Sequence, residues 1–243
     1  MYVKREYKFE NSIEIEKLYT YSHHRKGEKR NGKSKPTPES MKKYNYRRVI
    51  NYIRRLIKLN FMGGWHMTLT YRKNARPDAA LAKKNLELFM RRMAYHYKKQ
   101  GYELKYIIVT EYLNKAIHHH VIINDIPILA ELVIKQWRYG QPNFTAIYDN
   151  DDVATLAEYL VKETEKTFRE DPVHGTRYSC SRNLKKPEYT EKVIKANSFR
   201  EYPTIPEGYI LDVDSLVNGV SEVTGYEYQS YTLKKIQNIK QRR

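Results

Sequence analysis

The stretch LKYIIVTEYLNKAIHHHVIIN, residues 104 to 124, contains two apolar segments separated by a short polar segment. Three consecutive histidines lie at the start of the second apolar segment. Its β-branched and aromatic residues predict two strands, over 104–112 and 117–124. If Asn114 and Lys115 form a two-residue turn, the strands pair as a hairpin. In that register Glu111 lies directly opposite His118, and cross-strand partners share one face of a sheet.

The three histidines divide between the two faces of the predicted strand. Alternate side chains of a strand point the same way, so His118 and His120 share the face of Glu111, while His119 points to the other face. Two imidazoles and one carboxylate, with coordination positions left open, suit Mg²⁺ or Mn²⁺, and zinc accepts the same donors. A register slip by one residue would make His119 the ligand instead. The alternative is that all three histidines fill the strand and bond only to backbone or water.

The sequence around this hairpin predicts an alternation of strands and helices. Further strands are expected over 65–71 and 143–149, and helices over 39–60, 78–100, 127–137 and 151–168. From residue 65 the order is β-α-β-β-α-β with a trailing helix, which is typical of an α+β fold of the ferredoxin-like, split β-α-β kind. In that fold the first and third strands are the central pair of an antiparallel sheet. Helices cover one face, and we expect the other face to be open for a site.

Both ends of the chain lie outside this core. We expect a basic N-terminal arm and helix over 1–60, the core domain over 61–170 and a C-terminal extension over 171–243. Residues 22–38 are basic and show no apolar periodicity, so they indicate a flexible linker. After residue 168 several prolines and glycines predict irregular structure, followed by a basic helix near 229–242.

The charge of the chain indicates a polyanionic partner. Lys and Arg number 45 against 28 Asp and Glu, for a net charge of +17. Basic side chains gain affinity for nucleic acid by releasing the counterions condensed on its phosphates, and 23 tyrosines offer rings that stack on unpaired bases. The alternative is a basic protein without such a partner. The candidate DNA contacts are Arg47, Arg48, Arg54, Arg55, Arg182, Lys185 and Lys186.

Other classes of protein are disfavoured by the sequence. No run approaches the roughly 20 apolar residues of a membrane span, and the N-terminus lacks the apolar core of a signal peptide. Cys180 is the only cysteine, which excludes an internal disulfide and a zinc site built on several thiolates. We therefore expect a cytoplasmic protein. No GxxxxGK[ST] phosphate loop is present, so unwinding of DNA would need another protein.

These elements resemble the HUH endonucleases, and most of all the rolling-circle replication initiators of small plasmids and single-stranded DNA phages. The resemblance rests on the β-α-β-β-α-β order, the MTLTY strand, the histidine strand and a tyrosine in a later helix, and it covers about residues 61–190. The segment YSCSRNLKKPEY, residues 178–189, is similar to a Ser-Arg-x-Leu-Lys-x-Pro segment of phage-type replication proteins. One departure is His119, where the family usually has a bulky apolar residue; we expect it to be a semi-buried imidazole with satisfied nitrogens.

The resemblance implies metal-dependent, site- and strand-specific DNA nicking through a 5′-phosphotyrosine, with Tyr159 as the nucleophile and Lys162 as its helper in a Tyr-x-x-Lys pattern. Tyr159 lies beyond the edge of the apolar arc of its helix, on the flank of Lys162. No second tyrosine stands four residues before or after it, which implies a one-tyrosine enzyme. The same pattern also occurs at Tyr95, Tyr102, Tyr189 and Tyr231.

The implied partners are single-stranded or origin DNA, a divalent metal, and a helicase and polymerase of a bacterial host. Two other interpretations stay open at this point. One keeps the chemistry in a single-tyrosine transposase or a plasmid-mobilisation relaxase. The other is a non-catalytic DNA- or RNA-binding module on a ferredoxin-like sheet, which predicts aromatic side chains on the central strands, where this chain has histidines.

Overall fold

The computed structural model describes residues 1–20, 38–112, 116–148, 152–170, 178–195 and 198–236. The chain divides into two compact units. The first contains Met1–Asn45 and Pro187–Arg243, and the second contains Tyr46–Lys186. Among the helices that the structure describes, none combines the length and the apolar character needed to cross a membrane.

The second unit has the predicted α+β order. Its elements are α1 (Glu39–Asn60, which begins in the first unit), β3 (Trp65–Thr70), α2 (Ala79–Lys99), β4 (Tyr106–Glu111), β5 (His118–Ile123), α3 (Leu129–Gln136), β6 (Pro142–Ala146), α4 (Asp152–Glu170) and β7 (Ser179–Cys180). The strands form an antiparallel sheet in the order β6-β3-β5-β4-β7. The prediction that the first and third core strands are neighbours at its centre is therefore confirmed.

Local signals in the sequence account for several of these boundaries. The α1 helix begins directly after Pro38, a residue whose fixed φ suits a helix start. The side chain of Asp78 accepts a hydrogen bond of 2.7 Å from the backbone N–H of Leu81 and so caps α2. Gly101 ends the same helix with φ +80°, a conformation that favours glycine.

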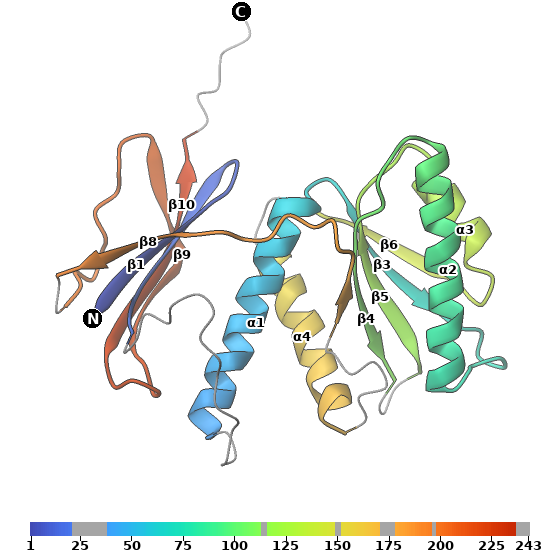
Figure 1. Cartoon of the computed structure of the whole chain (residues 1–243), viewed down its shortest axis with the longest axis horizontal. Helices are drawn as coiled ribbons and strands as arrows, with labels where there is room; N and C mark the ends of the chain where they lie inside the picture. Colours follow the sequence, from blue (N-terminus) through green and yellow to red (C-terminus); the bar gives the residue numbers. More distant parts are fainter. Residues whose placement is uncertain (21–37, 113–115, 149–151, 171–177, 196–197, 237–243) are drawn as a thin grey trace, which may run out of the picture. The chain divides into compact units, whose positions relative to one another are not determined.

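Helices cover both faces of the central sheet, as Figure 1 shows, with α2 and α3 on one side and α1 and α4 on the other. The expectation of one open face is therefore wrong. The reason lies in strands β4 and β5, whose apolar side chains alternate to both faces, as Ile107 and Ile108 do. Ile107 belongs to the core that α1 and α4 complete, and Ile108 belongs to the core that α2 and α3 complete.

The first unit is built on a second antiparallel sheet, in the order β8-β1-β2-β10-β9. Its strands are β1 (Tyr2–Lys8), β2 (Ser12–Tyr19), β8 (Thr190–Ile194), β9 (Tyr209–Val220) and β10 (Glu227–Lys235). Segments from both ends of the chain thus share one sheet, an arrangement that the sequence did not reveal.

The prediction of an irregular C-terminal extension with a helix near 229–242 is wrong for the residues that the structure describes. Residues 227–235 are strand β10, which pairs with β2 and β9. Tyr231 and Leu233 are buried on one face of it, which is the period-two spacing of a strand. Of the expected linker over 22–38, only Pro38 lies within the described residues.

Candidate metal centre and its tyrosine

The β4–β5 hairpin brings the first two candidate metal ligands together. Glu111 and His118 are directly paired in the register that the sequence predicted, although the expected turn at Asn114 and Lys115 lies outside the described residues. The Oε2 atom of Glu111 lies 3.1 Å from Nε2 of His118. Residues that face each other across an antiparallel pair need no other part of the fold to place them on one side.

His120 completes a three-ligand group. Its Nε2 atom lies 3.1 Å from Nε2 of His118 and 3.9 Å from Oε2 of Glu111. Bonds of about 2.0–2.2 Å from a divalent ion to nitrogen and oxygen place neighbouring ligand atoms roughly 3–3.5 Å apart. Two of the three separations have this value, and the third, at 3.9 Å, is somewhat wider. Glu111 and His120 are buried and His118 is half-buried, which leaves the group a side toward solvent. These residues can hold a divalent metal.

The hydrogen bonds of the two histidines favour metal binding through Nε2. A nitrogen that binds a metal must be unprotonated, so the ring proton has to lie on the other nitrogen and needs an acceptor there. In His118 the Nδ1 atom lies 2.7 Å from the backbone oxygen of Ala116, to which it donates. In His120 the Nδ1 atom lies 3.1 Å from Nε2 of His66 and 3.4 Å from Oγ1 of Thr68.

His119 lies on the opposite face, as predicted. It is completely buried, its Nδ1 atom lies 2.9 Å from Oγ1 of Thr110, and its Nε2 atom lies 2.9 Å from the hydroxyl of Tyr71. Its ring also meets Trp137 edge-on, at a centroid distance of 5.8 Å. Both nitrogens are therefore satisfied within the core under α2 and α3, and the register is not the slipped one that would make His119 a ligand.

Tyr159 reaches the group from helix α4. Four residues of that helix, Val153, Ala157, Leu160 and Val161, are buried in the core that covers this face of the sheet. Their packing fixes the position of the helix. The Tyr159 hydroxyl lies 3.4 Å from Nε2 of His120, and the two rings meet edge-on with centroids 5.2 Å apart. Tyr159 as a whole is 37 % exposed, so this residue lies next to the metal ligands and is also partly open to solvent.

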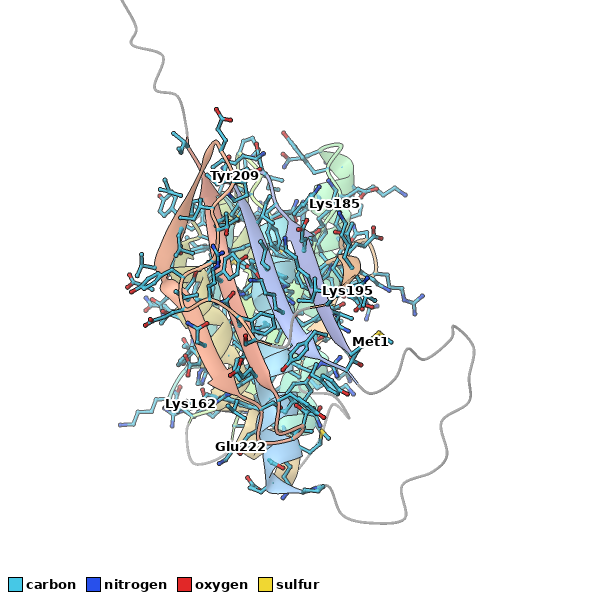
Figure 2. All side chains as sticks on the ribbon, turned by 90° about the vertical axis from the view of Figure 1, so that its left-hand side faces the viewer. Met1, Lys162, Lys185, Lys195, Tyr209 and Glu222 are labelled. Carbon is cyan, nitrogen blue, oxygen red and sulfur yellow. The ribbon has the colours of Figure 1, made fainter. Side chains whose placement is uncertain are left out.

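Lys162 is exposed one helical turn after Tyr159, and Figure 2 shows its side chain extending away from the ribbon. A long, exposed side chain of this kind can reach a bound phosphate or remain in solvent. Its role as the helper of Tyr159 stays a prediction.

The predicted DNA contacts differ in exposure. On α1, Arg47 and Arg48 are exposed and Arg54 is partly exposed. Arg55 is buried, with 6 % exposure, and a buried guanidinium does not reach a DNA phosphate at the surface. The remaining three, Arg182, Lys185 and Lys186, are exposed in the segment after β7.

Sequence reasoning missed His66, whose ring stacks on that of His120 with centroids 5.3 Å apart. Burial lowers the pKa of His66 to about 4, so its imidazole is neutral at neutral pH. A signal for it was present in the strand WHMTLTY, 65–71. Because β3 pairs with β5, Thr68 lies opposite His120, and alternation puts His66 on the same face.

One comparison with known proteins gives a match. Residues 64–168 match the model of a family described as replication-associated protein ORF2. No curated protein and no solved structure matches the chain. The matched residues contain the three candidate metal ligands, Tyr159 and His66. Over this part of its length the chain is therefore similar to a family of replication-associated proteins, which is consistent with the expected replication initiator.

Proposed function

We propose that the protein is a metal-dependent DNA endonuclease and strand transferase that nicks one strand at an origin and so starts rolling-circle replication. The observation that carries this proposal is the hydroxyl of Tyr159, 3.4 Å from His120 in a group of two histidines and a glutamate. A nucleophile beside potential metal ligands suits transfer of a phosphoryl group. The match to replication-associated proteins supports the biological setting.

The reaction at Tyr159 is an exchange of one phosphodiester for another. Its phenolic oxygen forms a bond to the phosphorus of the scissile phosphate, and the bond from phosphorus to the 3′ oxygen breaks. The phenolic proton is lost to solvent, and the 3′ oxygen takes up a proton. The 5′ phosphate stays on Tyr159 as a phosphodiester, so attack by a 3′ hydroxyl reverses the step without ATP.

The residues around Tyr159 have separate tasks. Glu111, His118 and His120 would hold Mg²⁺ or Mn²⁺, which when bound polarises the phosphate and stabilises the charge that develops on its oxygens. The α4 helix fixes the position of the phenol, which lowers the entropic cost of attack. A free tyrosine titrates at pH ~10, and the cation of Lys162, one helical turn away, would stabilise phenolate charge.

DNA binding would use exposed basic side chains of the second unit. Arg47 and Arg48 on α1 and the cluster of Arg182, Lys185 and Lys186 are placed to contact phosphates, in a chain with a net charge of +17. In this proposal residues 61–170 are the nuclease domain and the two flanking regions bind the origin. Helicase and polymerase come from a bacterial host, in whose cytoplasm the protein acts.

The test is formation of a covalent adduct with DNA. Single-stranded oligonucleotides that tile the DNA of the encoding element are labelled at either end, incubated with Mn²⁺ or EDTA, and resolved on a denaturing gel. The protein should carry only the label at the 3′ end, since it keeps the downstream fragment by its 5′ phosphate. The adduct should need Mn²⁺ and disappear in Tyr159→Phe.

The matched control is Tyr95→Phe, since Tyr95 is 64 % exposed and also begins a Tyr-x-x-Lys pattern, but lies on α2. It should form the adduct normally. An adduct that survives Tyr159→Phe would assign the attack to another tyrosine. Tight DNA binding with no adduct, unaffected by EDTA, would favour the non-catalytic binding module.

A further inference from the structure

The two histidines of the metal centre are held by different kinds of group. His118 donates from Nδ1 to a backbone oxygen, that of Ala116, at 2.7 Å. The Nδ1 atom of His120 lies instead near two side chains of β3, those of His66 and Thr68. The orientation of His118 is thus fixed by the segment directly before its own strand, whereas the Nδ1 contacts of His120 are with side chains of the neighbouring strand.

The two candidate acceptors for His120 are not equivalent. Nε2 of His66 lies 3.1 Å from Nδ1 of His120, within the usual range of a hydrogen bond between nitrogens, while Oγ1 of Thr68 is at 3.4 Å. The His66 and His120 rings are stacked, with an interplanar angle of 26°. Since the centre needs His120 unprotonated at Nε2, its ring proton lies on Nδ1, on the side of His66.

We propose that His66 is the positioning residue of the metal centre: its Nε2 atom accepts the Nδ1 proton of His120 and so directs the Nε2 lone pair of His120 toward the ion and Tyr159. This inference rests on the proposed metal site, and it concerns a residue that is not itself a ligand. An outer partner of this kind fixes the tautomer and the orientation of a ligand, and its loss typically lowers metal affinity by about 10–100-fold.

The test uses three variants that separate the hydrogen bond from the shape of the side chain. His66→Leu removes the acceptor. His66→Gln restores an amide oxygen at nearly the place of Nε2 and should rescue binding. Thr68→Val keeps the shape of Thr68 and removes only the second candidate acceptor.

Affinity for Mn²⁺ is measured without DNA, from the electron paramagnetic resonance signal of the free ion, on full-length protein. We expect His66→Leu to bind Mn²⁺ about 10–100-fold more weakly, His66→Gln to recover most of that loss, and Thr68→Val to bind as the wild type. Unchanged affinity in His66→Leu would overturn the inference. So would equal losses in His66→Leu and His66→Gln, or a loss confined to Thr68→Val.

A spectroscopic readout covers the case in which His66→Leu fails to fold. In wild-type protein loaded with Mg²⁺, ¹⁵N–¹H correlation of the imidazole rings should show His120 protonated at Nδ1, and protonation at Nε2 would overturn the inference. Both readouts are independent of nicking. If the variants behave as expected and no DNA adduct forms, the proposed function fails while the role of His66 stands. If the wild-type protein forms the adduct and His66→Leu binds Mn²⁺ with unchanged affinity, the proposed function stands and the role of His66 fails.

Discussion

Adjacent histidines of strand β5 show how the two faces of one sheet use the same side chain differently. His119 is enclosed in a core, with each ring nitrogen 2.9 Å from a hydroxyl. His118 and His120 turn one nitrogen of each ring toward Glu111 and each other. An imidazole whose two nitrogens are both satisfied is structural, and one with a nitrogen directed at other donors can bind a metal.

The surroundings reinforce this difference. Tyr71, which bonds to His119, is buried, and its hydroxyl also donates to the backbone oxygen of Ala82 at 3.3 Å. Tyr159, which lies beside His120, is 37 % exposed. One tyrosine therefore completes a closed network of hydrogen bonds, while the other is accessible to a substrate.

The largest expected effect comes from Glu111→Gln, which removes the carboxylate charge at constant size. Loss of a direct ligand should exceed the 10–100-fold effect of an outer partner, so we expect Mn²⁺ affinity and adduct formation to fall by on the order of 10³-fold. Electron paramagnetic resonance and the denaturing gel measure the two quantities. Glu131→Gln, at an exposed glutamate of α3, is the matched control and should change neither; an active Glu111→Gln variant would remove Glu111 from the centre.

Substitution of His119 should lower the stability of the fold and leave the metal centre unchanged. His119→Leu leaves the hydroxyls of Thr110 and Tyr71 without this partner, at about 1–3 kcal/mol for each buried group. We expect the free energy of unfolding, measured by urea titration, to fall by about 2–6 kcal/mol, with Mn²⁺ affinity of the folded protein unchanged. The double variant Thr110→Val/His119→Leu should lose less than the sum of the single losses. Weakened Mn²⁺ binding in His119→Leu would show that His119 also supports the metal centre, and would contradict the assignment of a purely structural role to it.

Alkaline pH should destabilise the cores on both faces of the sheet, since Tyr71 packs in one and Tyr178 in the other. Burial raises the pKa of Tyr71 well above 10.0, the value for a free side chain, and raises the pKa of Tyr178 to about 12. Unfolded tyrosines lose their protons first, so the stabilisation is complete below pH ~10 and declines as the pH rises, by about 1.4 kcal/mol per unit for each such residue.

Urea titrations between pH 8 and 11 measure this slope, and Tyr71→Phe should make it shallower. Tyr95→Phe, at an exposed tyrosine, should leave the slope unchanged. A slope equal in Tyr71→Phe and in the wild type would show that the Tyr71 hydroxyl does not titrate with unfolding.

The smallest effect is expected at Lys162. Its exposed charge is screened by water, so Lys162→Met should slow adduct formation by less than about tenfold and leave Mn²⁺ affinity unchanged. Single-turnover rates at low and high salt measure this effect, and Lys162→Arg should keep most of the wild-type rate. A Lys162→Met variant as inactive as Tyr159→Phe would give the lysine a direct part in the chemistry.

The parts of the centre that were predictable from sequence are those set by local geometry. The hairpin register expected from the sequence pairs Glu111 with His118, as the structure does, and strand alternation separates His119 from its neighbours. His66 was missed because its partner is 54 residues away, and the pairing of β3 with β5 had to be followed through to the side chains.

The fold was predictable to a similar extent. The order of the core elements follows from periodicity, but the covering of the second face by α1 and α4 depends on tertiary packing, which periodicity does not report. The strands of the other sheet were missed because YVKREYK, residues 2–8, has four charged side chains in seven residues and no regular apolar alternation. One of its two partners, β8, also lies far along the chain. Local propensity is a weak guide for such segments.

The short hairpin that carries Glu111 and His118 also has a consequence for the order of folding. Closing a short loop costs little chain entropy, and isolated hairpins form within about 1–10 μs. A divalent ion can therefore hold these strands together before the more distant β3 and α4 are in place. Because the free energy of binding to a site absent from the unfolded chain adds to the free energy of folding, the supply of metal during synthesis would help to set how much of the chain reaches its native state.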